Sequence, residues 1–207
     1  MGTLRINVDH TVRIPARSAR VHATVSGQAT LTAGVAARKA ALVRELVAEL
    51  AGHGVPEDAV EVTGVRLATS DAKLLRTQSV ELGLVVAVAT ERLPDVLGVL
   101  ADRGGLSVDQ VEWVYEEFEA SVGVTATAMT MARRKADAVA AAAGLEVTGI
   151  LEASDSWSMP ARMDRAIPAP MMAASARGAS APLDLGIELS ATTELSVHLS
   201  VDFALSP

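Results

Sequence analysis

The residues best suited to catalysis or metal binding in this chain are its histidines. There are four, namely His10, His22, His53 and His198. No two of them stand at a spacing such as His-x-x-x-His, which would place two imidazoles on one helix face as metal ligands. All but His53 fall on expected strands and would meet only if those strands were neighbours. We therefore predict no metal site and expect solvated or locally hydrogen-bonded histidines.

An acidic run offers a second kind of chemistry. The segment EWVYEEFE contains Glu112, Glu116, Glu117 and Glu119. Two carboxylates can divide acid and base work when they are buried about 5–10 Å apart. The same residues also suit the charged edge of a strand, where they discourage pairing with other chains. We favour this second interpretation.

Nucleophilic and phosphate-binding motifs are not evident. Residues 154–158 read SDSWS and supply serine and aspartate, but no histidine for a hydrolase triad. The glycines form neither a P-loop nor a dinucleotide-binding fingerprint. The chain has no cysteine, which excludes disulfides and thiolate sites. We expect no catalytic residue, no cofactor and no bound metal, and hence a protein that is not an enzyme.

Composition narrows the class of protein further. Of 207 residues, 50% are hydrophobic but only 2% aromatic, so Val, Leu, Ile and Ala must fill the core. The net charge of −7 weighs against a nucleic-acid binder. No segment has the roughly 18 uninterrupted apolar residues of a transmembrane span, and the first residues lack an apolar signal core. We expect a cytoplasmic protein as written, or a periplasmic or secreted one if a signal peptide was removed.

Hydrophobic periodicity predicts the elements that must position these residues. Alternation with period two predicts strands at 4–14, 19–27, 61–70, 79–89, 107–118, 146–157 and 187–205. Helical periodicity predicts helices at about 32–51, 91–105 and 120–143. The result is an α+β fold with helices packed on a mainly antiparallel sheet. Its order is of the split βαβ type, βαββαβ and then αββ, and a long strand ends the chain. We expect a single domain over residues 1–207.

The helix at 120–143 has an unusual apolar stripe. Alanines recur at every fourth position, at Ala128, Ala132, Ala136 and Ala140. Such a ridge is one methyl group high and brings the helix backbone close to its neighbour, while alanine has the best helix propensity. We interpret the stripe as a packing surface.

The last strand and the segment before it suggest self-association. A strand of about 19 residues is several times the usual length, and its polar face is rich in Ser and Thr. We therefore predict a homo-oligomer formed by strand pairing or sheet packing around residues 187–205. The interface candidates are Thr192, Ser196, His198, Arg13 and Arg17. The Met- and Arg-containing stretch 158–184 is expected to be a flexible or docking loop.

The order of these segments resembles the SIMPL-domain family. The resemblance rests on ARRKADAVAAAAGLEVTGILEAS, on PAPMMAASARGASAPLDLGIELSATTELSVHLSVDFAL, and on the earlier LVRELVAELAGHGVPEDAVEVTGVRL and ELGLVVAVATERLPDVLGVLADRGG. This bacterial family, formerly a domain of unknown function, includes outer-membrane or periplasmic immunogenic proteins and has no established catalytic residues. The resemblance implies an oligomerising protein, in the form of a ring or hollow barrel, with a scaffold or stress-associated role. The alternative is a small-ligand or metal-binding module that uses a groove under the 158–184 loop.

Overall fold

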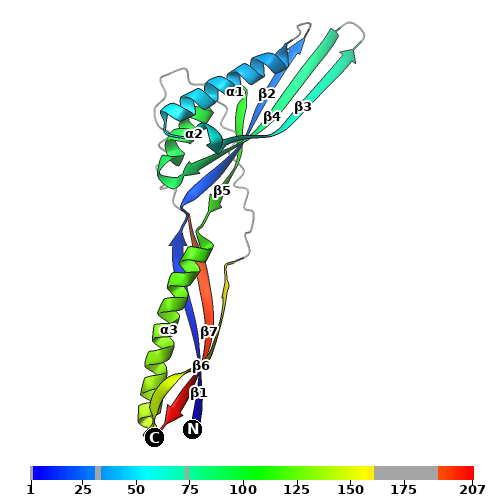
Figure 1. The fold of residues 1–207 in the computed structure, drawn as a ribbon. Coiled ribbons are helices and arrows are strands. Elements are labelled where there is room, and N and C mark those ends of the chain that lie inside the picture. Colours follow the sequence, from blue (N-terminus) through cyan, green and yellow to red (C-terminus); the bar gives the residue numbers. More distant parts are fainter. Residues whose placement is uncertain (1, 31–33, 73–74, 161–190) are drawn as a thin grey trace. The chain divides into compact units, whose positions relative to one another are not determined.

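The described residues form two compact units (Figure 1). The structure is a computed structural model that describes residues 2–30, 34–72, 75–160 and 191–207. Unit 1 contains residues 2–15, 115–160 and 191–207, and unit 2 contains residues 16–114. The predicted 158–184 loop lies outside the described residues beyond its first three positions.

Unit 2 is a four-stranded antiparallel sheet with helices on one face. Its elements are β2 (Ser18–Thr30), α1 (Val35–Gly52), the short 3-10 helix η1 (Glu57–Ala59), β3 (Val60–Ala72), β4 (Leu75–Ala89), the 3-10 helix η2 (Thr90–Arg92), α2 (Leu93–Ala101) and β5 (Leu106–Val114). The strand order is β3-β4-β2-β5, so each helix connects two strands that have a third between them. The predicted split βαβ arrangement is thus confirmed. Leu46 and Leu50 of α1 and Leu100 of α2 pack against the buried face of β2 and β4.

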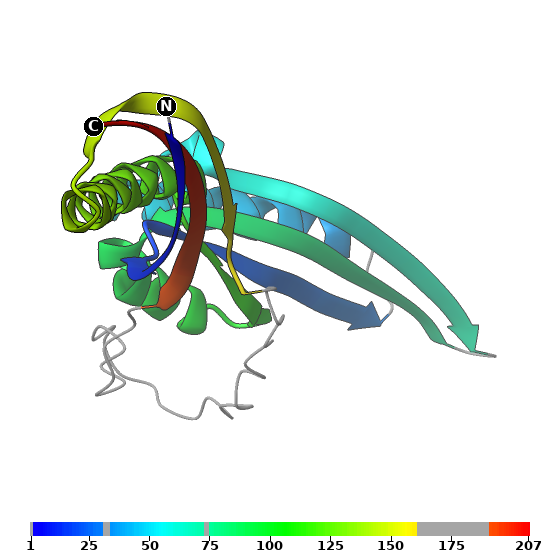
Figure 2. The same ribbon diagram turned by 90° about the horizontal axis from the view of Figure 1, so that it is seen from below.

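Unit 1 consists of three antiparallel strands and one long helix. They are β1 (Gly2–Pro15), α3 (Glu117–Ala142), β6 (Glu146–Ser158) and β7 (Thr192–Ser206). We call the sheet of order β1-β7-β6 sheet A. In a view along α3, the three strands curve around one side of the helix (Figure 2). The alternating apolar residues of β7, among them Leu195, Leu199 and Phe203, are fully buried beneath α3.

The alanine stripe forms the contact between α3 and sheet A. Ala128, Ala132 and Ala136 are 0% exposed and pack against β1 and β7. The start of the helix is stabilised by acidic residues in its first turn, which interact favourably with the helix dipole. At its end, Gly144 adopts a φ of 71°, a left-handed conformation that closes the helix and suits glycine.

Several predicted boundaries were wrong, as two strands of unit 2 show. The strand predicted at 107–118 ends at Val114, and α3 begins at Glu117. Consequently, of the acidic run only Glu112 lies on a strand, and Glu117 and Glu119 belong to the first turn of α3. The run is therefore not a strand edge. The strand predicted at 19–27 continues past Gly27 to Thr30, because β4 pairs with it over its whole length.

The argument that β7 needs a partner from another chain was also wrong. β7 is the central strand of sheet A. β1 pairs with it from Thr192 to Leu205, and β6 pairs with it from Ser196 to Ser206. From Ser196 to Leu205, β7 therefore has a strand of its own chain on each side, so strand pairing between chains cannot involve this part of β7. Sheet packing through its polar face stays a prediction.

Candidate functional site

The face of sheet A turned away from α3 carries rows of polar side chains. We call it the outer face. The register sets out five rows across β1, β7 and β6, namely Arg5–Asp202–Glu152, Asn7–Ser200–Ser154, Asp9–His198–Ser156, Thr11–Ser196–Ser158 and Arg13–Glu194. The rows arise because side chains of a strand alternate between faces, and the apolar positions of β7 are taken by the core. Polar residues far apart in the sequence therefore meet on this face.

The first row contains an ion pair with two hydrogen bonds, between Arg5 and Asp202. Arg5 donates two hydrogen bonds to Asp202, at 2.7 Å from Nε and 2.6 Å from the terminal nitrogen. These bonds, together with the positive charge of Arg5, hold the pKa of Asp202 below its ordinary value. The same contact raises the pKa of Arg5. β1 and β7 are thereby joined by side chains as well as by backbone.

The third row brings together an acid, an imidazole and a hydroxyl. Nδ1 of His198 lies 2.6 Å from Oδ1 of Asp9, and Ser156 stands beside His198 on β6. Ser156 makes no hydrogen bond to His198 among the described residues, so the geometry is that of an Asp–His pair with a neighbouring hydroxyl. The row borders a depression of about 320 Å³. Its lining comprises Asp9, Thr11, Ser156, Trp157, Ser158, Ser196, Val197 and His198. Such a surface can hold a polar group or a cation.

The other histidines do not join this site. His10 is next to Asp9 on β1, so its side chain is on the opposite face from His198. His22 belongs to unit 2, where its Nε2 lies 3.5 Å from Glu112. His10 and His198 thus lie on opposite faces of sheet A, and the described residues contain no group of three or more metal-ligating side chains.

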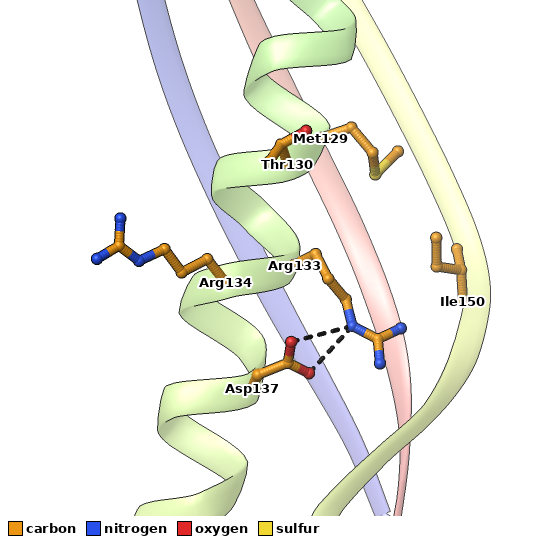
Figure 3. A pocket seen from close by; sticks show the side chains of 6 residues that line it. All are labelled: Met129, Thr130, Arg133, Arg134, Asp137 and Ile150. Carbon is orange, nitrogen blue, oxygen red and sulfur yellow. Dashed lines mark hydrogen bonds and ion pairs between the residues drawn. The ribbon is translucent and has the colours of Figure 1, made fainter.

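A second depression lies between α3 and β6 (Figure 3). It has a volume of about 530 Å³, is open to solvent, and is lined by Met129, Thr130, Arg133, Arg134, Asp137 and Ile150. Arg133 donates a hydrogen bond of 3.0 Å to Asp137, one turn along α3, and reaches β6 through a bond of 3.3 Å to the carbonyl oxygen of Val147. Its charge is thus already balanced. The apolar side chains of Met129 and Ile150 form the rest of the wall.

β6 has apolar side chains that its own helix leaves uncovered. Ile150 and Trp157 lie opposite the buried Phe203 and Val197, yet they are 51% and 41% exposed. On β1, by contrast, Ile6 and Val8, which lie opposite Val201 and Leu199, are buried. Hence α3 covers β7 and β1 more fully than it covers β6, and Ile150 and Trp157 stay uncovered.

Unit 2 has a similar uncovered row on its edge strand β3. Val62, Val65 and Leu67 are at least half exposed, although they pair with residues of β4 that are buried beneath α1. Exposed apolar residues on an edge strand favour contact with another molecule.

The structure gathers most of the predicted interface residues on one surface. Arg13, Thr192, Ser196 and His198 all belong to the outer face of sheet A. Arg17 does not, because it follows β1 and its backbone N–H donates to Val114 within unit 2. Sequence analysis missed the pairing of His198 with Asp9 and Ser156. No local signal marks it, since 189 residues separate His198 from Asp9.

These features define an α+β protein whose distinctive surfaces are two sheets with open edges. A family model, SIMPL, described as a protein of unknown function (DUF541), matches residues 5–203. The chain therefore belongs to the SIMPL family, as its sequence predicted. Comparison with curated proteins finds no match. Among the helices described, none is long and apolar enough to cross a membrane.

Proposed function

We propose that this SIMPL protein is a non-enzymatic, self-associating protein with a scaffold or stress-associated role, assembled as a ring or hollow oligomer. The observation that supports it is the apolar surface of β6, where Ile150 and Trp157 are uncovered although the residues of β7 opposite them are buried. Large side chains in such positions favour burial by about 1.5–3 kcal/mol each. Further copies of the chain would supply that burial.

The mass of the wild-type protein in solution tests this proposal. We expect light scattering after size exclusion to give a multiple of the 21.4 kDa chain mass at micromolar concentration in ordinary salt. The high-molecular-mass species should persist on dilution into the low micromolar range. A mass equal to one chain would contradict the proposal.

A separate experiment tests whether copies of the chain pack on one another through the outer face of sheet A. Replacing Thr192 and Ser196 with Lys adds two positive charges to the proposed interface and leaves the buried Leu195 and Val197 unchanged. If copies pack through this face, repulsion between the added charges should weaken assembly, and the double variant should dissociate at a higher protein concentration than the wild type. An unchanged mass would exclude the outer face from the interface.

A ligand- or metal-binding module is the second candidate function. Its supporting observation is the depression at Asp9 and His198, which reaches Ser158, the first residue of the predicted 158–184 loop. A bound ligand stabilises the folded state by mass action. Addition of Zn²⁺ should then raise the melting temperature of the wild type but not that of His198→Ala. Equal melting temperatures with and without Zn²⁺ would argue against a metal site.

A further inference from the structure

Sheet A presents two free edges in the described part of the chain. β1, which has 14 residues, and β6, which has 13, each pair with β7 alone. A free edge carries a row of unpaired backbone N–H and C=O groups, which form a template for a strand from another molecule. Either edge is longer than a typical strand of about 5–6 residues.

The two edges differ in charge. β6 contains Glu146, Glu152 and Asp155 but no lysine or arginine. β1 contains Arg5 and Arg13 against one carboxylate, Asp9. Pairing two copies of β6 would bring acidic residues together, and pairing two copies of β1 would bring arginines together. Pairing β1 with β6 would instead place opposite charges side by side.

The row Arg5–Asp202–Glu152 makes this complementarity specific. Arg5 uses two of its five N–H donors on Asp202 and is 66% exposed, so its guanidinium group is accessible to another molecule. At the other end of the row, Glu152 has no hydrogen bond or ion pair within the described residues, and its charge acts on Arg5 of the same chain only from across the row. The row therefore begins with a cation and ends with an anion, each at a free edge.

The exposed apolar side chains also differ between the two sides of the unit, and the two sets could cover one another. Ile150 and Trp157 are uncovered on β6, on the side of the sheet where α3 lies. The flank of α3 turned away from β6 exposes Met131 and Val139, which stand about 200° around the helix from Met129 and Asp137. In a second copy that flank belongs to the half of the unit that contains β1.

We propose that β1 of one copy adds to β6 of the next copy, and that sheet A thereby continues from subunit to subunit. The proposal rests on the self-association put forward above and identifies its interface. Arg5 then lies beside Glu152 of the adjacent copy, and the Met131 flank of α3 covers Ile150 and Trp157. β1 and β6 run in the same direction, because both are antiparallel to β7, so the new pairing is parallel. A head-to-tail contact of this kind closes into a ring when the rotation between copies permits it.

Introduced cysteines provide a direct test, because the chain has none of its own. Within one chain Asn7 and Ser154 flank Ser200, two strand spacings or about 9.5 Å apart, which is beyond the reach of a disulfide. Between copies the proposal places them side by side. We expect the double variant Asn7→Cys/Ser154→Cys to give a ladder of covalent oligomers on non-reducing gels after mild oxidation. Each single variant should remain one chain.

A closed sheet can stagger along its strands, so Ser156→Cys and Ser158→Cys are also combined with Asn7→Cys. A ladder with any of the three partners supports the proposal. It is overturned if all three combinations remain uncrosslinked while the wild type has an oligomeric mass, or if either single variant forms a covalent dimer. A wild-type mass of one chain would instead contradict self-association itself.

Charge reversal at the edge gives an independent readout. Glu152→Lys should shift the mass at micromolar concentration from the oligomer towards one chain, because the introduced ammonium group would face Arg5 of the adjacent copy. The control is Val65→Lys, at an exposed position on β3 of unit 2. It should leave the mass unchanged. Loss of the oligomer in Val65→Lys but not in Glu152→Lys would move the interface to β3 and overturn the proposal.

Discussion

Asp202 lies on the outer face of sheet A, between the cationic Arg5 and the anionic Glu152. Because its hydrogen bonds with Arg5 lower its pKa, Asp202 contributes stability above the pKa of an unfolded aspartate. That contribution is lost as the pH falls through the lowered pKa of the folded state. We expect Asp202→Asn to lower the urea midpoint at neutral pH and to match the wild type once the pH is below the folded pKa. Midpoints measured across this range check the sign, and a difference that grows with acid would contradict it.

The small side chain of Ala132 allows α3 to pack closely on sheet A. It is fully buried between α3 and sheet A, so a larger side chain must displace the helix or adopt a strained rotamer. We expect Ala132→Leu to lower the free energy of unfolding by about 1–3 kcal/mol. The matched control is Ala138→Leu, an exposed position of the same helix, which should change stability by less than about 0.5 kcal/mol. Equal effects in urea denaturation would mean that the stripe tolerates bulk.

At the scale of the element, two glycines of unit 1 differ only in backbone conformation. Gly144 has a φ of 71° after the end of α3, whereas Gly123 lies inside α3, and an added Cβ would meet no atom within 4 Å at either position. We expect Gly144→Ala to cost about 1 kcal/mol, because the left-handed region is unfavourable for alanine. Gly123→Ala should gain about 0.5–1 kcal/mol from helix propensity. Thermal unfolding of both variants tests the pair, and changes of the same sign would refute it.

Elements with a strong period were predictable from sequence. The alternation through Leu195, Leu199 and Phe203 and the four-residue alanine repeat are local patterns, and the structure has a strand and a helix there. The boundary near Glu116 was missed, because Val111 and Trp113 continue an alternation that ends only where acidic residues begin the next helix. The central place of β7 was also missed. Which strand lies in the middle depends on pairing between distant segments, and no local pattern encodes that.

The candidate site was less predictable than the fold. His198 was identified as an interface residue from its place on the polar face of the last strand. Its contact with Asp9 follows only from the register of β1 on β7. The uncovered state of Ile150 and Trp157 depends on where α3 lies across the sheet. Pattern analysis gives the polar and apolar faces of a strand but not which parts of them a helix covers.

At the scale of the whole molecule, the described residues of unit 2 all fall within one stretch of chain, whereas those of unit 1 come from three separate segments. The ends of that stretch are adjacent, since the N–H of Arg17 bonds the carbonyl oxygen of Val114 at 2.9 Å. We therefore expect residues 16–114 expressed alone to fold, with cooperative thermal unfolding by circular dichroism. The matched control, residues 115–207, lacks β1 and should show no such transition. A structureless 16–114 fragment would show that unit 2 depends on the rest of the chain.

The order of strands in sheet A has a consequence for biosynthesis. β7 is the middle strand, yet it follows β1 and β6 in the chain. A ribosome that adds roughly 5–20 residues per second therefore releases β1, α3 and β6 seconds before the strand that joins them. During that interval Ile6, Val8 and the alanine face of α3 have no sheet to pack on, while unit 2 can already fold. Nascent chains of this protein are thus natural clients for chaperones that bind exposed apolar segments until translation delivers β7.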